Sequence, residues 1–373
     1  MTVKTGVLIS NLGSPDAPTP EALRSYLDQF LMDPFVIDLP YLLRAFVVRG
    51  LILRKRAAAS AKAYEIIWTP EGSPLVVNTK NLTRKVQAAL GADYSVKFAM
   101  RYANPSFKNV LDEFLAEGIQ EVLLLPLYPQ WALASSASTD AHVRDLKHPC
   151  RVKAVLKPFY AHNDFIELFA TRVKETQEKF SNSKLKTHYL FSFHGIPERH
   201  IRKSPGCSKC PIDSECCLKE SAPEFCYRSH CTHTTHSLAA TLGLKTEEYS
   251  MSFQSRLGVD QWLLPFTDVV LKELPKKGVE RLVMLSPAFT SDCLETIEEL
   301  GERGQHDFIE AGGKEFHLVS SLNDRDDWAD VLAKWVKTPQ CFQILIIRWR
   351  LCNNFVSVLA CRHRISSRKA ANN

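Results

Sequence analysis

Short apolar stretches alternate with longer amphipathic stretches along most of the chain. The apolar stretches are short and bordered by turn residues, which predicts strands at 6–11, 95–100, 121–127, 188–193, 247–253 and 281–287. The amphipathic stretches between them predict helices at 20–31, 78–90, 105–117, 163–180, 234–243 and 266–275. Strands that alternate with helices form parallel sheets covered by helices. The pattern therefore predicts an α/β fold.

The two halves of this pattern resemble each other. Residues 7–15 (VLISNLGSP) align with 189–197 (YLFSFHGIP), and the order of the elements repeats as well. We therefore expect two similar Rossmann-like domains, 1–175 and 176–338, each a parallel sheet flanked by helices. Ligands of such sheets bind at the carboxyl ends of the strands. The functional cleft is expected between the two domains.

Charge is distributed unevenly in a chain of otherwise globular composition, with 45% hydrophobic and 24% charged residues. The net charge is +6, but 331–373 carries +8 without a single acid, so the remaining residues carry −2. The segment 339–373 is thus a basic, apolar tail. Two alternatives fit it: peripheral contact with an anionic membrane surface, or an extension that was never selected to fold.

The expected location is cytoplasmic, with peripheral contact at the inner membrane surface through the tail as an option. No secretory signal is evident at the N-terminus. No apolar run reaches the roughly 18 residues of a membrane-spanning helix. No basic stripe with interleaved aromatic residues flanks the cysteine-rich segment, so no nucleic-acid partner is expected.

One histidine stands directly after a predicted strand, in the segment SFHGIP (192–197). His194 is therefore expected on a tight turn at the carboxyl end of that strand. An imidazole exchanges a proton near neutral pH, which suits a general base or a metal ligand. The alternative is a purely structural histidine.

Carboxylates follow another strand end, in the segment SPAFTSDCLETIEEL (286–300). Ser291 or Asp292 is expected to cap a helix on which Asp292, Glu295 and Glu299 share one face. Such a row is either a solvated surface or, if it points into the cleft, a path for a dication or for protons.

Aromatic and small polar residues also gather near strand ends: 68–74 (WTPEGSP), Arg101 with Tyr102, and 128–131 (YPQW) followed by Ser135. The alternative to a site is a set of core aromatic residues and a surface serine run. If they line one cleft, they suit a flat, apolar ligand with anionic edges, and Arg101 is the expected carboxylate partner.

With these motifs the chain resembles the ferrochelatases, lyases that insert ferrous iron into a porphyrin in the last steps of haem synthesis. The resemblance spans about 6–335 and rests on NLGSPDAPTPEALRSYLDQFL, EGSPL, LPLYPQ, SFHGIPERH, SFQSRLGVDQWLLPFTD and SPAFTSDCLETIEEL. These motifs are most similar in sequence to those of the proteobacterial members that use protoporphyrin. The resemblance implies chelatase-like domains around a cleft, protoporphyrin IX and Fe²⁺ as substrates and haem b as product. We expect a monomer or homodimer.

The resemblance also implies residue roles. His194 and Glu295 match the family's catalytic histidine and glutamate, both at the substrate iron, and Glu299 matches its outer acidic residue. The porphyrin-binding residues it implies are Arg101, Tyr102, Tyr128, Gln130 and Ser135. Cys293 stands where animal members have a histidine. The alternatives are a chelatase for another tetrapyrrole or metal, and a non-catalytic metal- or iron–sulfur-binding protein.

Six of the eleven cysteines lie in the segment 204–231, which is longer than its counterpart in simple family members. In a protein that is not exported, such a cluster more often binds metal than forms disulfides. One alternative is structural zinc, favoured by a CxxC pair and by nearby His230 and His233. The other is a [2Fe–2S] cluster, which the resemblance to some bacterial ferrochelatases favours. Four ligands are expected among Cys207, Cys210, Cys216, Cys217 and Cys226, with Cys231 as a substitute.

Overall fold

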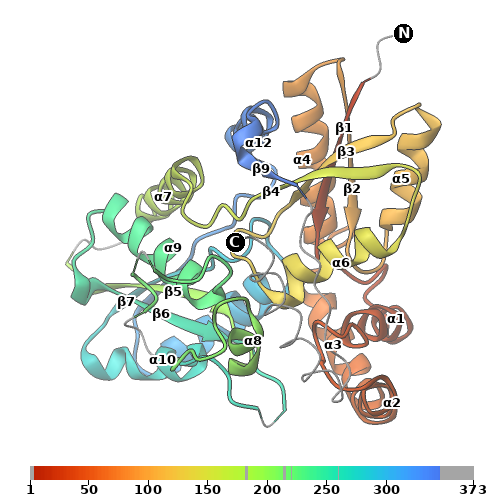
Figure 1. Ribbon diagram of the computed structural model, residues 1–373. Helices are drawn as coiled ribbons and strands as arrows, with labels where there is room; N and C mark the ends of the chain where they lie inside the picture. The colour runs from red at the N-terminus through yellow and green to blue at the C-terminus, as the bar shows by residue number, and fades with distance from the viewer. Residues whose placement is uncertain (1–3, 181–183, 213–215, 220, 259, 345–373) are drawn as a thin grey trace, which may run out of the picture.

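The computed structural model describes residues 4–180, 184–212, 216–219, 221–258 and 260–344, which form two helix-flanked sheets (Figure 1). Most of the basic tail lies outside the described residues, so neither alternative for it is tested. Among the described residues, no helix is both long and apolar enough to cross a bilayer.

The first sheet has the strand order β2-β1-β3-β4-β9. Its strands are β1 (Thr5–Asn11), β2 (Tyr94–Met100), β3 (Glu121–Pro126), β4 (Arg151–Leu156) and β9 (Phe342–Gln343). All pairs are parallel except β4 with β9. This sheet contains three of the six predicted strands.

The second sheet has the order β6-β5-β7-β8 and is parallel throughout. Its strands are β5 (Thr187–His194), β6 (Tyr249–Gln254), β7 (Arg281–Leu285) and β8 (Glu315–Leu318). The prediction of two parallel sheets is confirmed. The periodicity did not predict β4, β8 and β9, because these strands lie at or near sheet edges and their residues are largely only partly buried.

Helices cover both sheets, and the predicted ones are all present. They are α1 (Pro20–Leu31), α2 (Tyr41–Ala45), α3 (Leu53–Ile67), α4 (Pro74–Leu90), α5 (Phe107–Ala116), α6 (Ser138–Asp145), α7 (Asn163–Gln177), α8 (Glu198–Lys203), α9 (Tyr227–Thr241), α10 (Thr267–Glu273), α11 (Gly304–Glu310) and α12 (Asp326–Val336). Three π-helices join them: η1 (Phe46–Ile52), η2 (Leu133–Ala137) and η5 (Glu295–Arg303). Short 3₁₀ turns are η3 (Thr246–Glu248), η4 (Pro275–Lys277) and η6 (Pro339–Cys341).

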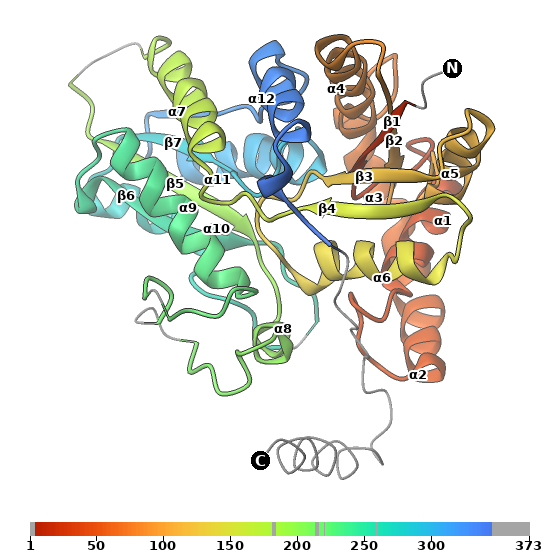
Figure 2. The same cartoon turned by 45° about the horizontal axis from the view of Figure 1, so that its top comes forward.

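The last elements of the chain return to the first sheet. Helix α12 packs against α4 and α7, and β9 pairs with β4 (Figures 1 and 2). Trp328 and Trp335 of α12 bury their rings against Phe159. The domain limits 1–175 and 176–338 stay a prediction. Helix α12 belongs to the second range by sequence but packs against α4 of the first.

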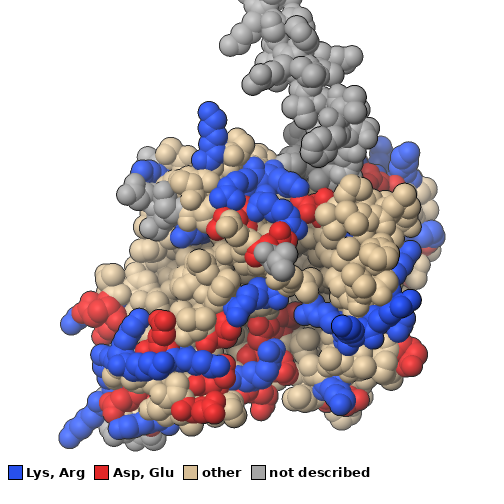
Figure 3. Space-filling view, turned by 90° about the horizontal axis from the view of Figure 1, so that it is seen from below, with Lys and Arg blue, Asp and Glu red and all other residues tan. Residues whose placement is uncertain are grey.

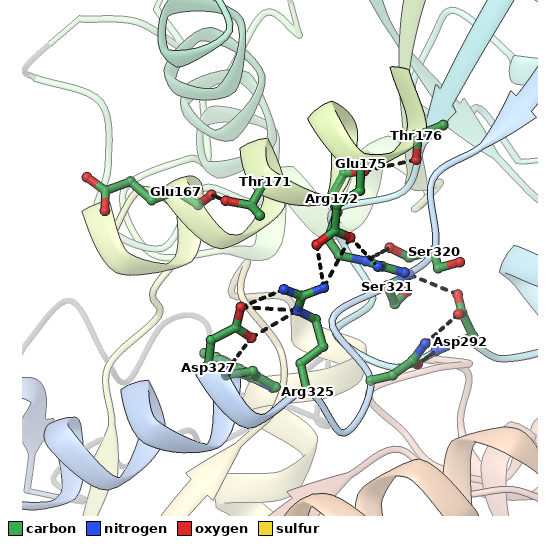
Figure 4. A network of polar contacts seen from close by, with 12 residues as sticks. Glu167, Thr171, Arg172, Glu175, Thr176, Asp292, Ser320, Ser321, Arg325 and Asp327 are labelled. Carbon is green, nitrogen blue, oxygen red and sulfur yellow. Dashed lines mark hydrogen bonds and ion pairs between the residues drawn. The ribbon is translucent and has the colours of Figure 1, made fainter. Parts of the chain in front are cut away.

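A polar network fastens this junction (Figure 4). Arg325, just before α12, donates to Glu175 of α7 at 2.8 Å and to Asp327 at 2.7 Å. Arg172 of α7 donates to Glu175 at 2.6 Å. The two arginines share one carboxylate, so the loop that leads into α12 is tied to the helix that precedes the second sheet.

Candidate active site

His194 is the last residue of β5, as predicted from its place after an apolar stretch. The next residue must be glycine, because a Cβ on Gly195 would lie 2.8 Å from the Ser255 carbonyl oxygen. The Gly195 N–H donates to the Gln254 carbonyl at 2.6 Å, which ties the turn to the end of β6. The His194 Nδ1 lies 2.7 Å from the Gly195 carbonyl, an acceptor, so Nδ1 carries the proton. This tautomer leaves the Nε2 lone pair free to accept a proton.

The π-helix η5 carries two carboxylates near this turn: Glu299 interacts with His194, and Glu295 is a neighbour of Glu299. Glu299 accepts a hydrogen bond from Ser255 at 2.6 Å, directly after β6. Burial raises the pKa of Glu299, the Ser255 hydrogen bond and His194 oppose this shift, and the charge of Glu295 adds to it. The Glu295 backbone carbonyl accepts from Gln254 at 3.1 Å. The structure thus brings together His194, Glu295 and Glu299, although His194 lies about 100 residues before the two glutamates in sequence.

Asp292 does not belong to this row, and the predicted cap is wrong. Neither Ser291 nor Asp292 caps η5, which begins later and has no side-chain cap. The Asp292 carboxylate instead accepts from Asn323 at 2.7 Å and from the Ser321 N–H at 3.1 Å (Figure 4). Asp292 therefore fastens the start of η5 to the loop before α12.

The first domain contributes buried phenols that the sequence did not single out. Tyr26 of α1 and Tyr64 of α3 are buried, and their pKa values are raised by burial first and by the charge of Glu295 among their neighbours. Burial and then Glu295 likewise raise the pKa of the Cys293 thiol. Glu295 thus interacts with Tyr26 and Tyr64 of the first domain, so it lies where the two domains meet. In sequence, Tyr26 and Tyr64 are indistinguishable from other apolar positions of amphipathic helices.

Arg101, the expected carboxylate partner of a ligand, already has a carboxylate partner within the protein. Its guanidinium donates to Asp33 at 2.6 Å and to Ser138 at 2.8 Å. The Tyr102 hydroxyl donates to the same Asp33 oxygen at 2.8 Å. The Asp33 side chain is 2% exposed and that of Arg101 13%. The porphyrin-binding roles of Arg101 and Tyr102 stay predictions, and the buried network limits how far either side chain reaches a ligand.

The loop after β3 carries the other predicted porphyrin contacts. Tyr128 is partly buried, and burial raises its pKa to about 12. Gln130 is buried and donates to Thr234 at 3.0 Å and to the Pro287 carbonyl at 3.2 Å, both in the second half of the chain. Ser135 lies partly buried in η2. The Gln130 side chain thus joins the two halves of the molecule.

The cysteine-rich segment brings its thiols together in pairs. Cys207 lies beside Cys226, and Cys216 lies beside both Cys210 and Cys217. Burial, and then the neighbouring Cys226 thiol, raises the pKa of Cys207. The Cys207 side chain therefore favours the thiol form, and a bound cation would offset the cost of its thiolate. A donor set of this composition fits an iron–sulfur cluster, whose ligands are thiolates.

The positions of the potential ligand atoms do not favour a zinc site that includes His230. A tetrahedral zinc–thiolate site places its sulfurs about 3.8 Å apart, since each bond is about 2.3 Å. Among the described residues, the one trio of potential ligand atoms that all lie within 4.8 Å is the largely exposed His306, Asp307 and Glu310. Both nitrogens of His230 are already engaged, with the Trp131 N–H at 3.1 Å and the Glu224 carbonyl at 2.7 Å. Burial lowers the pKa of His230 to about 4, so this imidazole is neutral.

Comparison with known proteins decides the family. A ferrochelatase family profile matches residues 4–340. The chain belongs to the ferrochelatase family. The ferrochelatase of Pseudomonas entomophila (strain L48) is 43% identical over 338 residues, covering 88% of this chain and 97% of that protein. The ferrochelatase of Coxiella burnetii (strain Dugway 5J108-111) is 40% identical over 336 residues, covering 90% and 93%.

Among solved structures, SirB from Bacillus subtilis with Fe³⁺ matches 90% of this chain and 94% of its own, with 11% identity and a TM-score of 0.49.

The family profile and the related ferrochelatases confirm the family that the motifs predicted. The chain is therefore an enzyme that inserts iron into a porphyrin for haem synthesis.

Proposed function

We propose that this ferrochelatase inserts Fe²⁺ into protoporphyrin IX to form haem b, with His194, Glu295 and Glu299 as the reacting groups. The observation that carries the proposal is the convergence of a histidine with a free Nε2 and two carboxylates at the ends of β5 and β6. These groups come from separate segments, and the site between them offers both a proton acceptor and anionic ligands.

Metallation releases two pyrrole protons for each Fe²⁺ that enters the ring. The Nε2 of His194 accepts one of them, and the Nδ1–H bond to Gly195 holds the imidazole in the tautomer that this requires. Glu295 meets the incoming dication as a carboxylate. The raised pKa of Glu299 suits a group that takes up the second proton and passes it outward. Contacts that favour a bent ring over a flat one would lower the barrier further.

An anaerobic assay tests the substrate. Fe²⁺ is expected to enter protoporphyrin IX faster than it enters coproporphyrin. The rise of the absorption bands of each iron porphyrin measures the two rates. Co²⁺ with protoporphyrin serves as the comparison for a chelatase of another metal. Equal or higher turnover with coproporphyrin or another tetrapyrrole would assign a different substrate to the same site, and no turnover with any pair would favour a non-catalytic binding protein.

We further propose that the paired cysteines hold a [2Fe–2S] cluster, with Cys207 and Cys226 as one pair and Cys210 with Cys216 as the other. The support is the pairwise approach of these thiols and the engagement of His230 elsewhere. Such a cluster supplies one-electron redox chemistry or structural bonds. Cys217, whose carbonyl accepts from Ser229 at 2.8 Å, is the alternative to Cys216.

The visible spectrum of anaerobically purified protein measures this cluster. We expect iron and sulfide in equal amounts and absorption that Cys207→Ala abolishes. Cys150→Ala is the matched control, since Cys150 is equally buried but lies in the first sheet's core. A colourless protein with one tightly bound zinc per chain would contradict the assignment.

We also propose that the enzyme is cytoplasmic and contacts the membrane peripherally, through a second surface besides the tail. Large apolar side chains lie exposed on α2 and η1, among them Leu42 (82%) and Phe46 (63%). Between Asp38 and Glu65 the chain has six basic residues and no acid. The underside of the molecule, where α2 and α8 lie in Figure 1, carries lysine and arginine side chains, interspersed with acidic ones, beside wide uncharged areas (Figure 3). An apolar face with basic flanks is typical of interfacial binding to anionic lipids.

Vesicle co-sedimentation tests this surface. With anionic vesicles of phosphatidylglycerol and phosphatidylcholine, L42E/F46E is expected to weaken binding at least about tenfold, because two exposed apolar side chains that would enter the lipid are lost. Ile309→Glu on α11, another exposed apolar position, is the control. Unchanged binding in the double variant would move the membrane contact to the tail beyond residue 344.

A further inference from the structure

One face of α9 is polar and yet buried. The helix begins directly after Cys226, and Tyr227, His230 and Thr234 follow at spacings i, i+3 and i+7, which places them on one side. Their residues are 5%, 1% and 0% exposed. Buried polar groups are costly unless they are hydrogen-bonded. The partners of this face therefore indicate what the helix does.

Tyr227 holds the turn that carries His194. Its hydroxyl donates to the His194 backbone carbonyl at 2.8 Å. The bond acts on the last peptide of β5, directly beside the imidazole whose orientation the Gly195 carbonyl fixes. A displacement of the Tyr227 hydroxyl would therefore shift the imidazole.

His230 and Thr234 hold the loop after β3. The Nδ1 of His230 accepts the Trp131 N–H at 3.1 Å, and the Thr234 hydroxyl accepts from the Gln130 side chain at 3.0 Å. His230 also stacks on Tyr160, with ring centroids 3.7 Å apart. This loop contains the predicted porphyrin contacts, so one helix face touches both sides of the site.

The cysteine-rich segment adds a contact of its own and sets where α9 begins. Phe225 packs its ring against that of Trp131, with centroids 5.2 Å apart. Cys226 occupies the N-cap position of α9 without a side-chain cap, and its thiol lies beside Cys207 instead. Whatever the thiols bind therefore fixes the first turn, which contains Tyr227 and His230.

We infer that α9 is a brace in which Tyr227 and His230 are positioning residues, Tyr227 for His194 and His230 for the Gln130–Trp131 loop, and that the cysteine-rich segment anchors this brace. The inference rests on the proposed function, because it assigns a purpose to His194 and to the loop. It gives the cysteine segment a mechanical link to the reaction that needs no electron transfer.

Two variants separate the two ends of the brace. Tyr227→Phe is expected to lower kcat about tenfold and leave the Kd for protoporphyrin, measured by porphyrin fluorescence, unchanged, because it loosens only the His194 turn. His230→Leu is expected to weaken porphyrin binding about tenfold and to speed amide hydrogen exchange at Trp131 by at least as much. His230→Asn, which keeps a side-chain acceptor, is expected to restore part of the Trp131 protection.

Tyr189→Phe is the matched control. Tyr189 is a buried tyrosine on β5, the same strand as His194, but its hydroxyl accepts from Gln177 at 2.6 Å, away from the site. Equal kcat for Tyr227→Phe and Tyr189→Phe, or a wild-type exchange rate at Trp131 in His230→Leu, would overturn the brace. Amide exchange at Trp131 does not depend on turnover, so it separates failure of the brace from failure of the role proposed for His194.

Discussion

Replacing His194 by alanine is expected to lower kcat for iron insertion by about 10²–10⁴-fold, the usual contribution of a positioned proton acceptor. The loss follows from the geometry of the turn, where Nδ1 is committed to the Gly195 carbonyl and Nε2 alone remains to accept a pyrrole proton. Anaerobic initial rates with Fe²⁺ and protoporphyrin measure the effect. If the cysteines hold the proposed cluster, its absorption should be unchanged in the same preparation.

The control for this variant is His188→Gln. His188 is buried near the opposite end of the same strand from His194, and its Nε2 contacts Ser250 at 2.8 Å. Glutamine keeps a polar group there, so activity should stay near that of the unmodified enzyme. If His194→Ala metallates porphyrin as fast as His188→Gln, the assignment of His194 as proton acceptor is wrong.

The largest stability effect is expected from Asp33→Ala, at about 3–5 kcal/mol of unfolding free energy. The substitution leaves the guanidinium of Arg101 buried without its counter-charge, and it removes the acceptor of Tyr102 and Ser138. It also breaks the bond from the Phe35 N–H at 2.7 Å. Urea denaturation followed by circular dichroism measures the change.

Asp28→Ala provides the comparison. Asp28 also forms an arginine pair, with Arg49 at 2.7 Å, but the Asp28 side chain is partly exposed (30%) and that of Arg49 is exposed (51%). Water and salt screen such a pair, so its loss should cost far less than that of Asp33. Similar denaturation midpoints for the two variants would mean that the buried network contributes little to stability.

The local pattern of the chain was enough to predict much of the fold. Apolar stretches of strand length predicted six strands, and all six are present, because buried parallel strands need continuous apolar residues. The helix over 20–31 begins where Pro20 follows Thr19, and the Thr19 side chain accepts from the Ala22 N–H at 3.3 Å. The place of His194 at a strand end also followed from sequence, since only the preceding residues define it.

The partners of the polar side chains came from the tertiary structure alone. Arg101 was expected to meet a ligand carboxylate, yet it pairs with Asp33, 68 positions away. The sequence predicted that Asp292 shares a helix face with Glu295 and Glu299. Its carboxylate oxygens instead accept hydrogen bonds from Ser321 and Asn323 of a distant loop. Helical spacing says which residues share a face, but it does not say which distant segment that face meets.

By itself, the sequence determined the α/β architecture, the ferrochelatase motifs and the segment in which the cysteines cluster, because each depends on residues near one another in the chain. Only the tertiary structure decided that α12 and β9 return to the first sheet, and that Tyr227 and His230 connect the cysteines to both sides of the site. Those contacts join segments as far apart as α4 and α12, and their free energy depends on burial and geometry that no local pattern encodes.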